Sequence, residues 1–168
     1  MRKYIAVIAG ILMLAAVNFT IYQREHLLEQ GSVVLLELAP VDPRSLMQGD
    51  YMALRFKVAR DAFPGFGWND VKEGTPSDGH LVVTLDEHGV GSFKHFADAT
   101  PLAKNEALLR YRIRNQQPKF ATNAFFFQEG HAEEYAKARY GEFRVAQNGD
   151  MILTALRGAD YQKLGLAQ

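Results

Sequence analysis

An uncharged run near the N-terminus constrains this chain more than any other feature. No Asp, Glu, Lys or Arg occurs from Tyr4 to Gln23. A helix of about 20 residues, rising about 1.5 Å per residue, crosses the hydrocarbon core of a bilayer, which is about 30 Å thick. The run is apolar all round rather than striped, which disfavours a core helix of a soluble protein. We therefore predict one transmembrane helix that contacts the lipid bilayer through residues 4–23.

The run has the composition of either a cleaved signal peptide or an uncleaved signal anchor. Cleavage needs small residues at the last and third-last positions before the cut. A cut after Ala16 places Leu14 third-last, and a cut after Val17 ends on an unfavourable residue. The sequence therefore favours the anchor. Arg2 and Lys3 precede the run, which predicts a cytoplasmic N-terminus and an exported remainder.

The composition of the whole chain excludes several classes of protein. The 168 residues include 19 basic and 19 acidic side chains, no Cys, and 48% hydrophobic residues. The balanced charge argues against a nucleic-acid partner. The lack of Cys excludes disulfides, thiolate metal sites and thiol nucleophiles. The apolar content is too high for a disordered chain.

The residue pattern changes from helical to β at Gly31, a usual helix terminator. We therefore divide the chain in two. Residues 1–31 form a cytoplasmic tip, the transmembrane signal anchor and a short helical extension. Residues 32–168 form an exported β-rich domain.

The exported part contains segments that alternate or are rich in β-branched residues, separated by turn residues. The predicted strands are 33–39, 51–58, 80–85, 90–96, 108–114, 142–146 and 151–156, with a shorter apolar segment at 125–127. Asn148-Gly149 between the last two strands is a strong hairpin signal. Residues 132–139 have the pattern of a short amphipathic helix. The expected fold is mainly β (α+β), a β-sandwich or partly closed barrel with one short helix, preceded by the transmembrane helix.

The second predicted strand opens with Gly49-Asp50-Tyr51-Met52-Ala53-Leu54-Arg55-Phe56. This segment resembles the signature of the bacterial GDYXXLXY family, with Phe56 in place of the final Tyr. Residues 127–145 resemble the C-terminal half of that family, so the likeness spans roughly 33–157. The family consists of membrane-anchored proteins whose genes often accompany those of polytopic membrane proteins. The resemblance implies a polytopic membrane partner, and it implies no activity or catalytic residue. Together with the predicted anchor and its orientation, it leads us to expect a single-pass protein of the bacterial inner membrane with a periplasmic domain.

The motif has a physical interpretation of its own. Gly49 permits a turn that other residues resist, and Asp50 can cap that turn through its carboxylate. Tyr51 then starts a strand. We therefore expect Gly49, Asp50, Tyr51, Leu54 and Phe56 to form a structural corner rather than a catalytic site.

A likeness to type I signal peptidases supports a different hypothesis, an envelope hydrolase. Those enzymes combine a short anchor, an exported β domain and a Ser-Met-x-Pro-Thr-Leu-x-x-Gly-Asp segment. Aligned on Gly-Asp, this chain has Val41 at the nucleophile position and Ser45 at the Thr position. Val cannot attack a carbonyl. The sequence therefore favours a shared turn-to-strand geometry without the chemistry, and Ser45 is left as a candidate hydroxyl.

Basic residues alternate along the predicted strand 108–114. Arg110, Arg112 and Arg114 share one face, and Arg55 and Lys57 share a face of another strand. Together they form either a basic sheet face for an anionic ligand, lipid headgroups or an acidic partner, or a solvated face with paired charges. The candidate contact residues are Tyr51, Arg55, Trp68, Arg110 and Arg112; Trp68 lies in the longest predicted loop, 59–79.

The remaining groups of titratable residues give little evidence for a metal or catalytic site. The spacing of His80, His88 and His95 fits no standard metal site, and the acidic residues around 129–134 suit the start of a helix. We expect no metal, no cofactor and no catalytic residue. The leading hypothesis is an exported accessory or interaction module for a polytopic membrane protein. The alternatives are an envelope hydrolase and a module that binds an anionic ligand or lipid.

Overall fold

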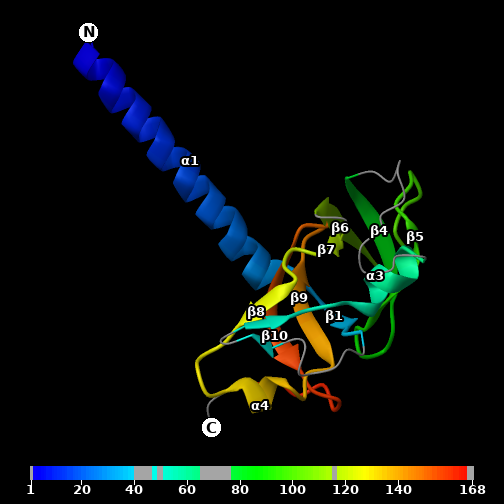
Figure 1. Cartoon of the computed structure of the whole chain (residues 1–168). Helices are drawn as coiled ribbons and strands as arrows, with labels where there is room; N and C mark the ends of the chain where they lie inside the picture. Colours follow the sequence, from blue (N-terminus) through cyan, green and yellow to red (C-terminus); the bar gives the residue numbers. More distant parts are fainter. Residues whose placement is uncertain (1, 40–46, 49–50, 65–76, 115–116, 166–168) are drawn as a thin grey trace.

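The structure is a computed structural model that describes residues 2–39, 47–48, 51–64, 77–114 and 117–165. Figure 1 shows a long helix that projects from a β-rich body, which comprises the described residues from 32 to 165. The body contains three antiparallel sheets that curve into a half-barrel, with two short helices among its described residues. The predicted mainly β fold with an N-terminal apolar helix is confirmed.

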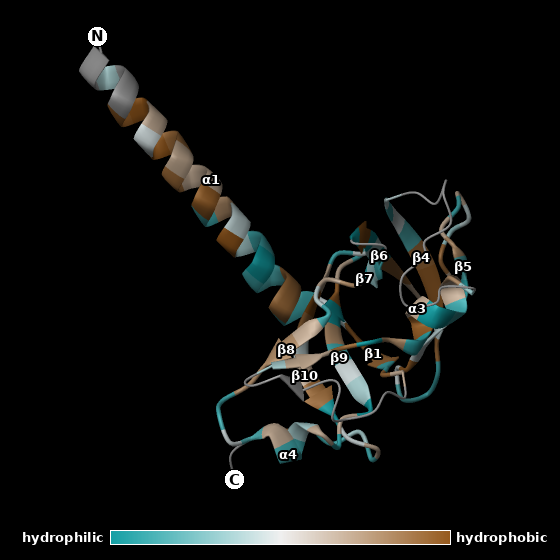
Figure 2. Cartoon of the chain, viewed as in Figure 1, coloured by the Kyte–Doolittle hydropathy of each residue, from teal (hydrophilic) through white to brown (hydrophobic). Residues whose placement is uncertain are grey.

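The projecting helix is α1 (Arg2–Gln30), and its segment Val7–Gln30 is long and apolar enough to cross a membrane. Two polar side chains within its apolar run bond to the backbone of the same helix. Asn18 donates a hydrogen bond to the carbonyl of Leu14, and Thr20 donates one to the carbonyl of Ala16, both at 2.9 Å. Such internal bonds suit a helix surrounded by lipid, where no water is available. Figure 2 shows that α1 is mostly apolar and becomes hydrophilic close to the body.

The first sheet contains the two ends of the β-rich body in the order β1-β9-β10. Its strands are β1 (Ser32–Glu37), β9 (Tyr140–Val145) and β10 (Met151–Arg157). Ser32 lies opposite Val145, and Val145 also lies opposite Met151. The predicted Asn-Gly hairpin between β9 and β10 is confirmed.

The second sheet has the order β5-β4-β6-β7. Its strands are β4 (Asp78–Leu85), β5 (Gly91–Phe96), β6 (Glu106–Arg114) and β7 (Gln117–Lys119). The third sheet is small and has the order β2-β3-β8. Its strands are β2 (Met47–Gln48), β3 (Tyr51–Ala53) and β8 (Ala124–Phe126).

Two seams join the first and second sheets. Along one seam, Leu35 of β1 donates its backbone N–H to the carbonyl of Gly89 at 2.9 Å. Along the other, Arg110 of β6 donates its backbone N–H to the carbonyl of Gly149 in the β9–β10 turn, also at 2.9 Å. The apolar residues between the sheets form one core. Its largest fully buried apolar side chains are Phe120, Phe143, Leu36, Leu54, Leu81, Leu109 and Leu156.

The predicted strand 51–58 is only partly correct. The strand ends at Ala53, and α3 (Lys57–Ala62) starts inside the predicted strand and extends into the predicted loop. Alternate residues are still buried as expected, from Met52 to Val58. However, Val58 and Ala62 are four residues apart and both buried, a helical spacing that the shorter alternating pattern conceals.

Other boundaries also differ from expectation. The predicted helix 132–139 is only one turn, α4 (Ala132–Tyr135). The predicted strand 108–114 begins earlier, at Glu106, and β7 and β2 were not predicted. The two missed strands are very short and carry little periodic signal.

Candidate functional site

The exposed face of β6 carries three arginines in alternation with core residues. Leu109 and Tyr111 point into the core, whereas the side chains of Arg110, Arg112 and Arg114 are 39%, 54% and 52% exposed. A strand directs successive side chains to opposite faces. The basic stripe expected from the sequence is therefore present on the outside of the second sheet.

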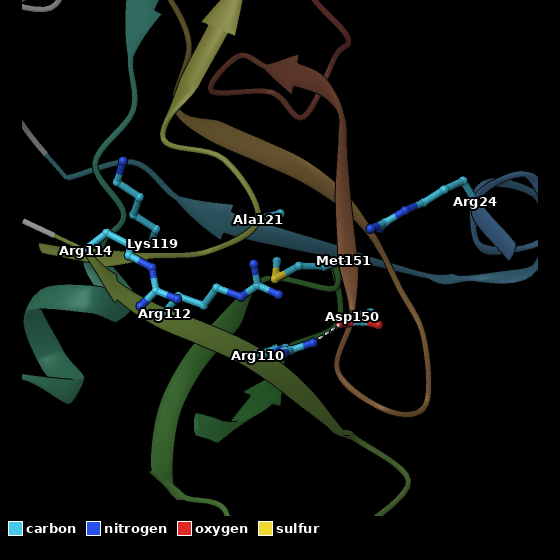
Figure 3. A pocket seen from close by; sticks show the side chains of 8 residues that line it. All are labelled: Arg24, Arg110, Arg112, Arg114, Lys119, Ala121, Asp150 and Met151. Atoms are coloured by element: carbon cyan, nitrogen blue, oxygen red, sulfur yellow. Dashed lines mark hydrogen bonds and ion pairs between the residues drawn. The ribbon is translucent and has the colours of Figure 1, made fainter. Parts of the chain in front are cut away.

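This stripe forms the floor of a cleft of about 290 Å³, which we call the basic cleft. Five of its lining side chains are cationic and one is a carboxylate. The lining residues are Arg24, Arg110, Arg112, Arg114, Lys119, Ala121, Asp150 and Met151 (Figure 3).

Arg24 reaches the cleft from α1 because the end of the helix is fixed on the β-rich body. Leu27 is buried, and the N–H of Gly31 donates to the carbonyl of Leu27 at 2.9 Å. Arg144 of β9 donates through Nη1 to the carbonyl of Gly31 at 3.0 Å. A Cβ at Gly31 would lie 2.5 Å from the carbonyl oxygen of Leu27, so the junction needs glycine. These contacts hold the last turns of α1 beside the cleft.

Asp150 reaches the cleft through the β9–β10 turn. Gly149 has φ +84°, and a Cβ there would lie 2.9 Å from the ring of His80 and 3.2 Å from the backbone N of Arg110. Glycine therefore permits both the turn and its contact with β6. Asp150 Oδ1 then accepts a hydrogen bond from Arg110 Nη1 at 3.1 Å.

The carboxylate of Asp150 is ionised in this setting. Partial burial raises its pKa, but hydrogen bonds from Arg110 and Asn148 and the charges of Arg110 and Arg24 outweigh burial. The net effect lowers the pKa of Asp150. One negative charge therefore offsets part of the positive charge of the cleft.

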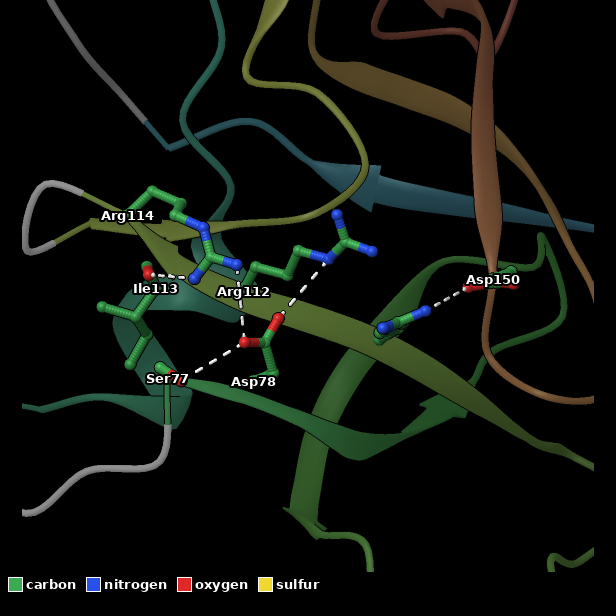
Figure 4. A network of polar contacts seen from close by, with 7 residues as sticks. Ser77, Asp78, Arg112, Ile113, Arg114 and Asp150 are labelled. Atoms are coloured by element: carbon green, nitrogen blue, oxygen red, sulfur yellow. Dashed lines mark hydrogen bonds and ion pairs between the residues drawn. The ribbon is translucent and has the colours of Figure 1, made fainter.

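Asp78 of β4 offsets a further part from the far side of the stripe (Figure 4). Its two oxygens lie 3.4 Å from Arg112 Nε and 3.5 Å from Arg114 Nη2. Arg114 also donates through Nη1 to the carbonyl of Ile113. The terminal nitrogens of Arg112 point away from Asp78, and Figure 3 shows them directed into the cleft.

The basic cleft keeps an excess of positive charge after these two carboxylates are counted. Arg112 lies between Asp78 on β4 and Lys119 on β7, each directly opposite it in the sheet. Like charges directly opposite each other destabilise a sheet. Within the described part of the chain, neither Lys119 nor Arg24 has a carboxylate within 4 Å. The cleft therefore presents N–H donors and net positive charge, which is the chemistry of anion binding.

The chain also matches a known protein family. A family model described as GDYXXLXY protein matches residues 13–156. The chain belongs to the GDYXXLXY family. The match confirms the resemblance carried by the motif at 49–56 and extends it into α1. No curated protein and no solved structure matches the chain.

The motif residues of this GDYXXLXY protein divide between core and surface. Leu54 and Phe56 are buried, and the Phe56 ring packs edge-on against Phe120 and Phe143 at centroid distances of 6.3 and 5.4 Å. Tyr51 is half-buried on β3. The end of the motif thus anchors the small sheet to the core, while Gly49 and Asp50 lie outside the described residues.

Two further residues of the expected basic face do not line the basic cleft. Lys57 is on α3 and forms an ion pair with Glu37 at 2.8 Å. Arg55 is half-buried, and burial lowers the pKa of its guanidinium. Only the β6 arginines of the expected face therefore contribute to the cleft. Trp68 and Ser45 lie outside the described residues.

Three charged members of the cleft are not predicted by the sequence. Arg24 is the first charged residue after the apolar run, and this position is its only signal. Lys119 requires knowledge of β7, and Asp150 has the pattern of an ordinary turn residue. All three depend on contacts between elements that are distant in sequence.

A second charged cluster in the GDYXXLXY protein is built differently. Glu142 of β9 is 2% exposed. Its carboxylate accepts hydrogen bonds from, or pairs with the charge of, three side chains. These partners, which complete what we call the Glu142 cluster, are Thr154, Arg157 and Lys163. Burial raises the pKa of Glu142, but the bonds from Arg157, Thr154 and Lys163 outweigh it and lower the pKa overall.

Two hydroxyl–carboxylate pairs among the described residues give no support to the hydrolase hypothesis. Thr154 donates to Glu142 at 3.0 Å, and Ser77 donates to Asp78 at 3.2 Å. Arginines already pair with both carboxylates. The bonds from Arg157, Thr154 and Lys163 lower the pKa of Glu142, and a carboxylate with a lowered pKa is a weak base that does not activate a hydroxyl. Among the described residues, no group of three or more His, Asp and Glu could hold a metal ion.

Proposed function

We propose that this chain is a single-pass protein of the bacterial inner membrane, with α1 as an uncleaved anchor and residues 32–168 on the periplasmic side. Three observations support the proposal: the apolar length of α1, the basic residues Arg2 and Lys3 before its uncharged run, and membership of the GDYXXLXY family.

The function proposed for the β-rich body is to bind an anionic group in the basic cleft. One observation carries this proposal: five cationic side chains from α1, β6 and β7 converge on one cleft in which a single carboxylate also lies. Asp150 and Asp78 offset part of this positive charge, and the excess that remains is unfavourable without an anionic ligand. Unfavourable arrangements of this kind concentrate at functional sites.

A thermal shift experiment tests anion binding. A ligand that binds only the folded state raises the melting temperature. The full-length chain in neutral maltoside detergent is titrated with inorganic phosphate, with chloride adjusted to keep the ionic strength constant. We expect a rise in melting temperature for the wild type and for the control Lys57→Gln, and a much smaller rise for Arg112→Gln. Equal rises in all three proteins would contradict the proposal.

A second candidate function is that of an accessory module for a polytopic membrane protein. It is favoured by the exposed ring of Phe126 on the third sheet, beside the half-buried Tyr51, because exposed aromatic groups mark contact surfaces. The Phe126 side chain is 74% exposed, and its ring lies 5.8 Å from that of Tyr51. A photo-crosslinking residue at position 126 is expected to capture a polytopic membrane protein in cells, whereas one at the exposed Leu102 is not. The same adducts from both positions, or none from position 126, would contradict it.

A further inference from the structure

We propose that the anionic group bound in the basic cleft is the phosphate group of a net anionic phospholipid from the membrane that α1 enters. This inference rests on the proposed anion-binding function and adds the chemical class and the source of the ligand.

The depth of Arg24 supports a lipid source. Arg24 follows Gln23, the last residue of the uncharged run, and therefore lies about 1.5 Å further along the helix axis. The headgroup layers add roughly 10–15 Å in total to the hydrocarbon core, so each is about 5–7 Å thick. With residues 4–23 in the core, Arg24 lies in the headgroup layer. Because Arg24 also lines the basic cleft, one wall of the cleft is at the depth of the lipid phosphates.

The available donors match phosphate. The terminal nitrogens of Arg112 are directed into the cleft, and Lys119 lies directly across the strand pair from Arg112. A guanidinium group can bond two phosphate oxygens with its parallel N–H groups, and an ammonium group supplies a point charge beside them. Arg24 adds a third cation from the side of the membrane. Because these cations line one cleft, they suit a single anionic group better than a row of acidic side chains.

The size and sign of the cleft restrict the headgroup. A volume of about 290 Å³ lies near the lower end of the range of small-molecule pockets, about 300–1,000 Å³. This volume suits a phosphate with a short polar substituent. Phosphatidylcholine and phosphatidylethanolamine carry an ammonium group beside the phosphate, and the cations of the cleft would repel it. Phosphatidylglycerol carries no such group and is the preferred probe.

Two experimental arms distinguish a lipid from a soluble phosphate compound. In the first arm, the full-length chain is placed in nanodiscs of phosphatidylcholine with phosphatidylglycerol, and the lipids retained after release are identified by native mass spectrometry. In the second arm, sn-glycerol 3-phosphate is titrated calorimetrically into the chain in neutral maltoside detergent. The variants are Arg112→Gln, Lys119→Gln and Arg24→Gln, and the control is Lys57→Gln, whose cation lies on α3 outside the cleft.

We expect the wild type and Lys57→Gln to retain phosphatidylglycerol in preference to phosphatidylcholine. Loss of one charged hydrogen bond should reduce this preference about tenfold or more in Arg112→Gln and Lys119→Gln. Arg24→Gln should reduce lipid retention more than it weakens glycerol phosphate binding, because Arg24 contacts the cleft from the membrane side.

The outcomes that would overturn the inference are separable from failure of the proposed function. Binding of glycerol phosphate that depends on Arg112, without preferential retention of phosphatidylglycerol, would overturn the lipid source and leave anion binding intact. No Arg112-dependent binding in either arm would overturn both. A phosphatidylglycerol preference that persists in both Arg112→Gln and Lys119→Gln would assign lipid binding to α1 alone and would also overturn the inference.

Discussion

The Glu142 cluster and the basic cleft both gather arginine and lysine around carboxylates, but they distribute the charge in opposite ways. In the Glu142 cluster, one carboxylate that is 2% exposed receives bonds from Thr154, Arg157 and Lys163. In the basic cleft, five cationic side chains converge; Asp150 in the cleft and Asp78 beside the stripe pair with three of them, Arg110, Arg112 and Arg114. The first arrangement leaves its buried charge fully bonded, and the second leaves donors available to a ligand. Satisfied polar groups stabilise a fold, whereas open donors of one sign create a binding site.

The largest expected effect follows from breaking the Glu142 cluster. Glu142→Gln removes the negative charge that Arg157 and Lys163 share, and leaves their guanidinium and ammonium groups uncompensated. Removing one partner of a buried ion pair lowers the free energy of unfolding by about 3 kcal/mol. Denaturant unfolding of the full-length chain in detergent measures this loss. A variant as stable as the wild type would show that the cluster is not structural.

Acid should remove the stability that the charged Glu142 carboxylate contributes to the folded state. The pKa of Glu142 in the folded state is lower than in the unfolded state, where it is about 4.3. Stability from this lowered pKa is therefore complete at neutral pH and is lost as the pH falls through the folded-state pKa. The stability difference between wild type and Glu142→Gln should narrow as the pH is lowered through this range. A difference that stays constant or widens in acid would contradict the assignment.

Gly149→Ala is expected to have the next largest effect, because it alters the turn that joins the first sheet to the cleft. Alanine at φ +84° is strained, and its Cβ would lie 2.9 Å from the ring of His80. We expect a loss of about 1–2 kcal/mol in the free energy of unfolding. The Arg110–Asp150 contact should also be displaced, which a change in phosphate affinity would report. Gly130→Ala is a matched control, because Gly130 also has positive φ but a Cβ there would meet no atom within 4 Å.

The smallest effect on stability is expected from Arg112→Gln, within the basic cleft itself. Its loss relieves the repulsion of Lys119, and Asp78 keeps Arg114 as a partner. The free energy of unfolding should change by less than about 0.5 kcal/mol. Denaturant unfolding beside Glu142→Gln checks the contrast directly. A loss as large as that of Glu142→Gln would mean that both clusters are structural.

Local patterns in the sequence predict some of these features and not others. The stripe on β6 and the Asn148-Gly149 hairpin follow from alternation and turn chemistry, which act over a few residues. The helix α3 was missed because Val58 satisfies both a strand and a helix spacing. The basic cleft was only partly predicted, because Arg24 and Lys119 approach the stripe through tertiary packing and a short strand pairing.

Side-chain NMR of the full-length chain labelled with ¹⁵N-arginine compares the two clusters most directly. Inorganic phosphate is added in neutral detergent, and the Nε–H signal of each arginine is assigned by single Arg→Lys substitutions. We predict that the signals of Arg112 and Arg110 in the cleft shift in a saturable way, while that of Arg157 in the Glu142 cluster stays in place. Equal shifts at Arg112 and Arg157, or no shift at Arg112, would contradict an anion-binding cleft.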